Sequence, residues 1–338
     1  MDCSESMVGE PKAAVEKGLA TMLSALRKDP YALETAYLSV ITFGTSAKQI
    51  VPLTELSQFQ LPKLILGSGT SLGAALELLE KRMAVEVKKS TTTEKGDYKP
   101  LVFLMTDGEP TDRWQTIADR FLKNRHLTMV AIGCGSDTNI ETLRKITELV
   151  VVGNEANEET LAKFFKWVST SVATASQAVD KTGDAKISLE KFPQDDDIKV
   201  VDENTPQPKI ESNRFVFLHC RCTKSKKFYL MKFVKSVKKS GGFFGFGGKE
   251  TYEVAGSFPL DDFEELGKSG GVSVSTEQLA GIVPCPYCGN AIVAHCECGK
   301  IHCCPDLTRK TIDLNCPWCG KHGAYGNTGG FNVGGGGG

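Results

Sequence analysis

The sequence has no uninterrupted apolar run of about 18 residues, the length that a membrane-spanning helix needs. It also has no signal-peptide pattern, in which a basic start and an apolar stretch precede a small-residue cleavage site. Without either segment, a cytoplasmic location is the default expectation.

The net charge of the chain is close to zero, and the sequence has no clear catalytic motif. The chain carries 40 Lys and Arg residues against 41 Asp and Glu residues, so no whole-chain attraction draws it to nucleic acid or to an anionic membrane. No nucleophile with an adjacent base, phosphate-binding loop or pair of carboxylates stands out, so we do not expect an enzyme. The chain does contain enough apolar residues, 41% of 338, for the cores of two globular domains.

Residues 1–175 alternate between strand and helix patterns. This alternation is typical of a doubly wound, Rossmann-like α/β domain, in which helices cover both faces of a mainly parallel sheet. Helices are predicted at 11–28, 71–87, 112–123, 140–147 and 159–172, and strands at 37–43, 45–53, 101–105, 128–132 and 150–152.

The pattern changes after residue 175. Residues 176–209 are polar and punctuated by proline, which predicts a linker. Residues 210–326 contain short strand patterns and most of the cysteines, which predicts a small β-rich, zinc-ribbon-like domain. Residues 327–338 are dominated by glycine and have almost nothing to bury, so we expect a disordered tail. Strands of the second domain are predicted at 215–218, 227–234 and 251–254.

Five oxygen-bearing side chains lie in three segments that resemble loops at helix starts. Asp2, Ser4 and Ser6 form an Asp-x-Ser-x-Ser run, Thr70 follows a glycine-rich stretch, and Asp107 directly follows a predicted strand. Ligands of doubly wound domains bind at the carboxyl ends of the strands, where these segments belong. Carboxylates and hydroxyls suit Mg²⁺ or Mn²⁺ in an octahedral site completed by water. The sequence therefore predicts one such site from these five residues.

Cysteine usage divides the chain. Cys3 and Cys134 are isolated, whereas the other ten cysteines lie between Cys220 and Cys319, mostly as close pairs. In a protein without a secretion signal, such crowding favours metal ligation over a disulfide framework. We therefore expect this part of the chain to bind zinc.

Two Cys-Pro-x-Cys-Gly knuckles carry the first predicted zinc site. Two thiolates from one tight turn can grip a tetrahedral Zn²⁺, and the glycine lets the backbone turn under the metal. Because two such knuckles fill four positions with sulfur, we predict a structural zinc ribbon. Its ligands are Cys285, Cys288, Cys316 and Cys319.

Two further Cys-x-Cys fragments indicate a second zinc site, for which two pairings are open. In the first, Cys220 and Cys222 join Cys296 and Cys298. In the second, Cys296 and Cys298 are completed by His302, Cys303 or Cys304. The first pairing is preferred because it ties the β-rich segment to the ribbon, and it brings the expected total to two Zn²⁺ ions.

The five oxygen ligands resemble the metal-ion-dependent adhesion site of von Willebrand factor A domains. The likeness covers residues 1 to about 174, and the segments 18–34, 72–79 and 105–108 resemble more narrowly the TerY group of tellurium-resistance proteins. The cysteine-rich end is similar to the metal-binding domain that follows the A domain in some of them. The resemblance implies that an acidic side chain of a partner protein completes the metal site, and that catalysis is not its role.

The resemblance also sets an expectation for the start of the chain. In an A domain, the first Asp ends a buried apolar strand in the middle of the sheet, yet only Met1 precedes Asp2 here. We expect the natural protein to begin earlier, with roughly 5 to 8 mostly apolar residues, an ordinary strand length.

We therefore expect a metal-ion-dependent protein-binding protein joined to a zinc-stabilised module. The TerY resemblance implies a role in bacterial stress response or phosphorylation signalling, with a protein kinase and a PPM-type phosphatase as partners. The alternative is a zinc-ribbon nucleic-acid-binding protein, because residues 214–239 interleave basic and aromatic side chains. The same stretch also fits a hairpin with a solvated lysine face and an aromatic core face, which we favour.

Overall fold

The computed structural model consists of two compact units, Met1–Ile210 and Glu211–Gly337. It describes residues 1–182 except 95, 108, 124–126 and 136–137; 198–236 except 203–204 and 206–213; and 250–334 except 261–262, 265–272, 282, 306–310 and 327–328. Among these residues, no helix is long and apolar enough to cross a membrane.

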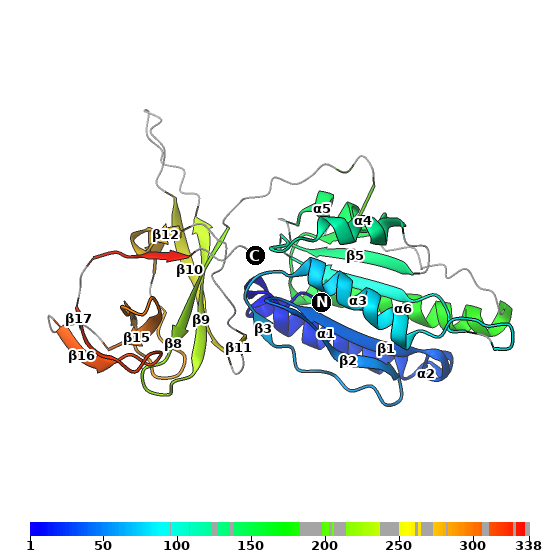
Figure 1. The fold of residues 1–338 in the computed structure, drawn as a ribbon, viewed down its shortest axis with the longest axis horizontal. Coiled ribbons are helices and arrows are strands. Elements are labelled where there is room, and N and C mark those ends of the chain that lie inside the picture. Colours follow the sequence, from blue (N-terminus) through cyan, green and yellow to red (C-terminus); the bar gives the residue numbers. More distant parts are fainter. Residues whose placement is uncertain are drawn as a thin grey trace. The chain divides into compact units, whose positions relative to one another are not determined.

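The first unit is built on a sheet with parallel strands at its centre (Figure 1). The strands β4 (Leu101–Thr106), β5 (Thr128–Cys134) and β6 (Val150–Gly153) are parallel, and β7 (Ile198–Val201) pairs antiparallel with β6. A hairpin is formed by β1 (Tyr37–Phe43) and β2 (Ala47–Glu55), and β3 (Leu66–Gly67) is a short strand.

The first residues of the chain connect β1 to β4. The Cys3 amide donates to the Phe43 carbonyl at 2.7 Å, and the Phe43 amide donates to the Met1 carbonyl at 3.0 Å. On the other side, the Asp2 amide donates to the Met105 carbonyl at 2.9 Å. Asp2 is thereby held between two strands at the edge where β4 ends.

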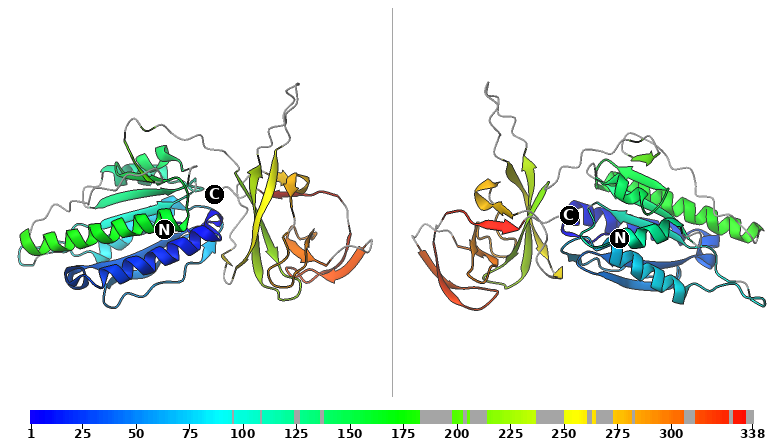
Figure 2. Two further views of the ribbon diagram at one scale, coloured as in Figure 1. Left: turned by 180° about the vertical axis from the view of Figure 1, so that it is seen from behind. Right: turned by 45° about the horizontal axis from the view of Figure 1, so that its top comes forward.

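Helices cover both faces of this sheet. On one face, α1 (Glu10–Leu26) and α6 (Glu158–Thr182) lie side by side (Figure 2, left). Phe103 of β4 packs against Phe164 and Trp167 of α6. On the other face, α3 (Leu72–Glu86), α4 (Gln115–Lys123) and α5 (Ile140–Arg144) contribute to one apolar core with β4, β5 and β6. The shorter η1 (Glu5–Met7) and α2 (Pro30–Thr35) flank α1.

The helix and strand patterns of the sequence predicted most elements of this unit to within a few residues. The predicted linker 176–209, however, needs correction. The helix α6 continues to Thr182, and β7 adds Ile198–Val201 to the sheet. Val150 and Val201, which face each other in the β6–β7 pair, both belong to the apolar core. A four-residue edge strand escapes detection because its burial depends on its partner. Residues 183–197, 203–204 and 206–209 lie outside the described part of the chain.

The second unit is a β domain. Its six-stranded sheet has the order β13, β10, β9, β8, β15, β14, in which β8 (Phe215–Arg221), β9 (Phe228–Ser236) and β10 (Thr251–Leu260) form an antiparallel meander. The strand β15 pairs parallel to β8. The remaining elements are β11 (Phe263–Glu264), β12 (Ser273–Ser275), η2 (Thr276–Gln278), β13 (Leu279–Ala280), β14 (Ile292–His295), β15 (Ile301–Cys304), β16 (Thr311–Asn315), β17 (His322–Gly326) and β18 (Asn332–Gly334).

The predicted disordered tail 327–338 also needs correction. The strand β18 pairs antiparallel with β12, and Val333 is buried opposite Val274. Phe331 packs on the same core and stacks on His295 with ring centroids 5.0 Å apart. Two apolar side chains among the glycines are thus enough to attach this segment. Residues 327–328 and 335–338 lie outside the described part of the chain.

Candidate metal-binding sites

A chain of hydrogen bonds links four of the five predicted oxygen ligands. The Ser4 amide donates to Asp2 Oδ1 at 2.8 Å, and the Ser4 and Ser6 hydroxyls are 2.8 Å apart. The Ser6 hydroxyl then donates to Asp107 Oδ1 at 2.7 Å. Asp2, Ser4 and Ser6 are all buried, whereas Asp107 is half-buried. The structure thus gathers side chains from two distant segments at the carboxyl end of β4.

Thr70 is held at the same edge by its backbone. Its amide donates to Thr111 Oγ1 and its carbonyl accepts from the Thr111 amide, both at 2.9 Å, which ties its loop to the segment after β4. The amide of Gly67 donates to the Cys3 carbonyl at 2.8 Å. The Thr70 hydroxyl is fully buried and has no hydrogen-bond partner among the described residues. A buried hydroxyl of this kind normally has a partner, and a cation would supply one.

The Asp2 carboxyl group is in a costly environment for an anion. Burial raises its pKa, and hydrogen bonds from Thr106 and Ser4 only partly oppose that shift. The Thr106 hydroxyl donates to Asp2 Oδ2 at 2.5 Å. A divalent cation would favour the ionised carboxylate in this buried position. The carboxylates, hydroxyls and unsatisfied Thr70 oxygen therefore fit a hard cation such as Mg²⁺ or Mn²⁺.

The first cysteine cluster consists of Cys222, Cys285, Cys288 and Cys303, whose sulfur atoms all lie within 4.8 Å of one another. A tetrahedral zinc ion with Zn–S bonds of about 2.3 Å separates its sulfurs by about 3.8 Å, so this cluster has the size of a Zn²⁺ site. Cys222 lies in the turn after β8, Cys285 and Cys288 lie in one knuckle, and Cys303 lies on β15.

The second cysteine cluster consists of Cys296, Cys298, Cys316 and Cys319, again within 4.8 Å of one another. The sulfurs of Cys296 and Cys319 are 3.8 Å apart, and those of Cys298 and Cys316 are 3.9 Å apart. The first two cysteines lie in the turn between β14 and β15, and the other two lie in the turn between β16 and β17. Both clusters therefore fit zinc.

These clusters correct the predicted pairing. The two knuckles do not share one ion, because Cys285 and Cys288 meet Cys222 and Cys303, while Cys316 and Cys319 meet Cys296 and Cys298. The parallel pairing of β15 with β8 aligns Ile301 with Cys220, so Cys303 comes beside the turn that holds Cys222. The hairpin of β14 and β15 carries Cys296 and Cys298 at its other end.

Three predicted or alternative ligands remain outside both clusters. Cys220 is buried in the core, and burial raises its pKa to about 12 despite a hydrogen bond with Tyr229. His302 is fully buried, with its ring edge-on to Tyr325 at 4.7 Å between centroids, and Cys304 is buried as well. Side chains alternate along β15, so His302 and Cys304 cannot share a face with Cys303.

Hydrogen bonds lower the pKa of one cysteine in each cluster. Burial alone would raise the pKa of Cys222, but hydrogen bonds from Ser225 and the Lys224 amide lower it to about 6. Burial likewise opposes ionisation of Cys296, whose pKa falls to about 6 through the Cys298 amide and the Tyr325 hydroxyl. Four sulfurs in contact cannot all carry negative charge without a cation between them, so thiolate formation and zinc binding go together.

The glycines of the two knuckles have the backbone conformation that their position requires. Gly289 and Gly320 have φ angles of 77° and 75°, in the left-handed region. In the turn that holds Cys222, the residue with a left-handed backbone is Lys226, at φ 62°, instead of a glycine. The turn therefore lacks the Cys-x-x-Cys-Gly motif. This departure from the motif explains why the sequence did not single out Cys222 as the partner of the first knuckle.

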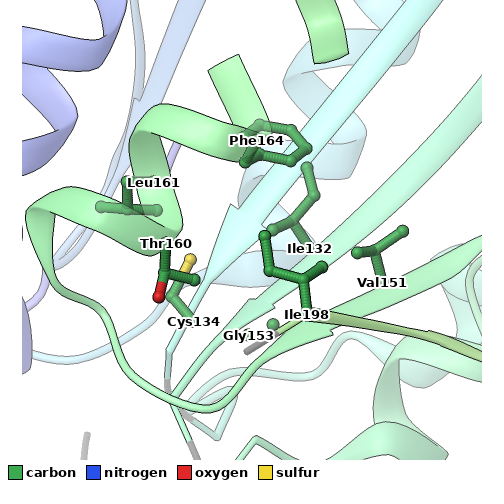
Figure 3. Close-up of a pocket in the computed structure, with 9 residues that line it drawn as sticks. Ile132, Cys134, Val151, Gly153, Thr160, Leu161, Phe164 and Ile198 are labelled. Carbon is green, nitrogen blue, oxygen red and sulfur yellow. The ribbon is translucent and has the colours of Figure 1, made fainter. Parts of the chain in front are cut away.

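The first unit also contains a small cavity between β5, β6, β7 and α6 (Figure 3). Its lining is mainly apolar and includes Ile132, Val151, Phe164 and Ile198. Its volume of about 10 Å³ is at the lower limit for a single water molecule. This volume leaves no room for a ligand larger than a water molecule.

The fold and sites together define a two-domain metal-binding protein, in which loops at a sheet edge form one candidate site and two tetracysteine clusters form the others. The family model of the von Willebrand factor type A domain matches residues 1–171, just over half of the chain, and the chain belongs to this family. The model of the TerY-C metal binding domain matches residues 212–338. Both matches confirm the resemblance and the fold class. No curated protein matches the chain significantly.

Three solved structures are among those similar to this chain. Proximal thread matrix protein 1 from the mussel byssus is 20% identical over 51% of this chain and 46% of its own, with a TM-score of 0.39. A von Willebrand factor type A protein from Catenulispora acidiphila is 19% identical over 51% and 41%, with a TM-score of 0.36. The ArnB paralog VWA2 from Sulfolobus acidocaldarius is 13% identical over 77% and 63%, with a TM-score of 0.35. The chain thus spans less than half the length of the first two, and these likenesses carry no argument about function.

Proposed function

We propose that the protein binds a partner protein through a Mg²⁺ or Mn²⁺ ion held by Asp2, Ser4, Ser6, Thr70 and Asp107. The observation that carries this proposal is the hydrogen-bonded chain from Asp2 to Asp107 beside the buried, unsatisfied Thr70 hydroxyl. The function is binding and not catalysis.

The partner contributes a carboxylate in this proposal. A hard octahedral cation takes six oxygen ligands, and the five side chains include only two carboxylates. Asp107 is half-buried at the sheet edge, so a coordination position at this side can be reached from solvent. A carboxylate is the side chain that such a cation accepts most readily, so an acidic surface of the partner fits the site.

The zinc-binding unit serves as a second docking module. Its match to the TerY-C metal binding domain supports metal binding by this unit. A role in bacterial stress response or phosphorylation signalling, with a protein kinase and a PPM-type phosphatase as partners, is our proposal from the resemblance to the TerY group. The nucleic-acid alternative has less support, because Phe217, Tyr229 and Phe233 are buried and cannot stack on bases. The Lys232 ammonium group lies 4.4 Å from the centroid of the Phe215 ring, so it covers one face of that ring as well.

Binding with and without Mg²⁺ tests this proposal. The full chain is immobilised and exposed to a cell extract with Mg²⁺ present or omitted, and the retained proteins are identified by mass spectrometry. Omission is preferable to a strong chelator, since a chelator would also attack the zinc sites. The same set of proteins should be lost when Mg²⁺ is omitted and when Asp107→Ala is used.

The matched control is Glu34→Ala, which removes an exposed carboxylate from α2 and should retain every partner. The purified partner then allows titration, in which charge reversal of its acidic surface should abolish binding. Partners that bind equally well without Mg²⁺, or equally well to Asp107→Ala, would refute the adhesion role.

A further inference from the structure

The two cysteine clusters differ in how exposed their cysteine residues are. Cys222 and Cys303 of the first cluster are 0% exposed and Cys285 is 3% exposed, and all three belong to the apolar core of the second unit. The fourth member, Cys288, is half-buried. In the second cluster, Cys298 and Cys319 are exposed. Because oxidants react with accessible thiolates, the two clusters have different chemical vulnerability.

The clusters also hold different parts of the domain. The first joins the end of β8 and the strand β15, which are neighbours in the six-stranded sheet. The second joins the β14–β15 turn to the turn between β16 and β17. Those two strands pair with each other in a separate two-stranded sheet.

Other contacts of the β16–β17 hairpin among the described residues come mainly from Trp318 in its turn and Tyr325 on β17. Trp318 Nε1 donates to the Ile301 carbonyl at 2.7 Å, and Arg221 Nη1 donates to the Pro317 carbonyl at 3.0 Å. Tyr325 packs edge-on against His302. The Ile312 and Leu314 side chains of β16 are only half-buried, so the hairpin has little apolar core of its own. Trp318 also packs edge-on against Phe228, with ring centroids 5.3 Å apart, and Arg221 lies over its ring. A zinc ion in the second cluster would add coordinate bonds from Cys316 and Cys319 to these contacts.

We propose that the second cysteine cluster is a peroxide-sensitive zinc site, whose oxidation releases its Zn²⁺ and frees the β16–β17 hairpin while the first cluster keeps its zinc. The reacting groups are the exposed thiolates of Cys298 and Cys319. Each has a buried partner sulfur within reach, Cys316 at 3.9 Å and Cys296 at 3.8 Å.

The oxidation balances with hydrogen peroxide as the named oxidant. The Cys319 thiolate attacks one peroxide oxygen, so an S–O bond forms, the O–O bond breaks and hydroxide leaves. The Cys296 thiolate then attacks the oxidised sulfur, so an S–S bond forms and a second hydroxide leaves. Two protons convert the two hydroxides to water. Zn²⁺ keeps its charge but loses two of its four ligands.

Zinc release from the intact protein tests this proposal. The full chain loaded with two zinc ions is treated with limiting hydrogen peroxide, while a chromophoric chelator reports free Zn²⁺ and mass spectrometry maps the disulfides. Release should first reach a plateau at one zinc per chain, with disulfides confined to the four cysteines of the second cluster. Hydrogen exchange should then show loss of protection in residues 311–326 and retained protection in β8 and β9.

Two variants test whether zinc release depends on the exposed cysteines or on a general loss of stability. Cys298→His with Cys319→His keeps zinc-binding side chains but removes the exposed sulfurs, so peroxide should release its second zinc far more slowly. Cys288→His, in the first cluster, is the matched control and should release one zinc as the unaltered protein does. If the double variant fails to hold two zinc ions, the disulfide map of the unaltered chain decides.

Three outcomes would overturn the proposal. These are simultaneous release of both ions, disulfides that form first among Cys222, Cys285, Cys288 and Cys303, and a zinc content unchanged by peroxide.

Discussion

The Ser6 hydroxyl donates a hydrogen bond of 2.7 Å to Asp107, across 101 positions of the sequence. It joins η1, which precedes α1, to the residue that follows β4. The two segments meet because parallel strands present their carboxyl ends at one edge of the sheet. Substitutions in either segment should therefore change metal binding. Matched substitutions outside the site separate the effect of losing a metal ligand from the effect of losing a structural side chain.

Thr70→Val should weaken Mg²⁺ binding without destabilising the metal-free fold. The Thr70 hydroxyl is buried without a hydrogen-bond partner among the described residues, so its removal leaves no carbonyl or amide unsatisfied. Loss of the oxygen ligand should lower the Mg²⁺ affinity at least about tenfold. Titration calorimetry and urea unfolding measure the two effects.

Thr147→Val is the control for this change. The Thr147 hydroxyl, in the segment between α5 and β6, donates to the Met129 carbonyl at 2.7 Å and accepts from the Leu149 amide at 3.2 Å. Met129 lies near the start of β5, at the end away from the candidate site. Its removal should destabilise the protein by about 1–3 kcal/mol and leave the Mg²⁺ affinity unchanged. A Thr70→Val protein that binds Mg²⁺ normally would remove Thr70 from the site.

Asp2→Asn should change how stability depends on pH. Burial raises the pKa of Asp2 in the metal-free folded protein, so the folded state holds this proton more tightly than the unfolded state. Its contribution to stability is fully present below the ordinary pKa of about 3.9 and is lost as the pH rises through the raised folded value. Metal-free Asp2→Asn should not show this loss, and at neutral pH it should be more stable than metal-free wild type.

Mg²⁺ should stabilise the wild type at neutral pH and have no effect on Asp2→Asn, because the variant lacks the carboxylate. Urea unfolding over a pH series, with and without Mg²⁺, measures both effects. Identical pH profiles for the two metal-free proteins would show that the Asp2 carboxyl group is not costly in the fold.

Cys222→Ser should reduce the zinc content from two ions to one, whereas Cys220→Ser should leave it at two. The first cysteine belongs to the first cluster, and the second is a neutral thiol in the core. The serine at position 222 should also unfold the six-stranded sheet, since this zinc joins β8 to β15. Elemental analysis and circular dichroism are the measurements. Two zinc ions in Cys222→Ser would contradict this assignment and support the pairing of the two knuckles around one ion.

Gly18→Ala should destabilise the first unit although alanine favours helix. A Cβ at Gly18 would lie 2.0 Å from Cδ2 of Phe165, where α1 packs against α6. Relieving this overlap requires the buried ring or the helices to move, at a cost of about 1–3 kcal/mol. Thr21→Ala, on the exposed side of α1, should be close to neutral in thermal unfolding. Equal stability of the two variants would mean that the ring relocates freely.

Strong local patterns in the sequence were enough to predict most of the first unit. Apolar spacing placed α1, α3 and α6 to within a few residues at their starts, and the run from Tyr37 to Phe43 matched β1 at both ends. These elements bury wide apolar faces, so their periodicity is visible without knowledge of a partner. By contrast, β7 and β18 are edge strands of four and three residues, and only their pairing gives them a buried side.

The sequence by itself determined that the cysteines would bind metal, because closely spaced thiols in tight turns have that chemistry whatever the fold. Only the tertiary structure decided which thiols share an ion. The parallel alignment of β15 with β8 brings Cys303 to Cys222, and the β14–β15 hairpin carries Cys296 and Cys298 to the other knuckle. Sequence spacing describes distance along one turn, whereas a tetrahedral site joins several turns whose separation is fixed by strand pairing.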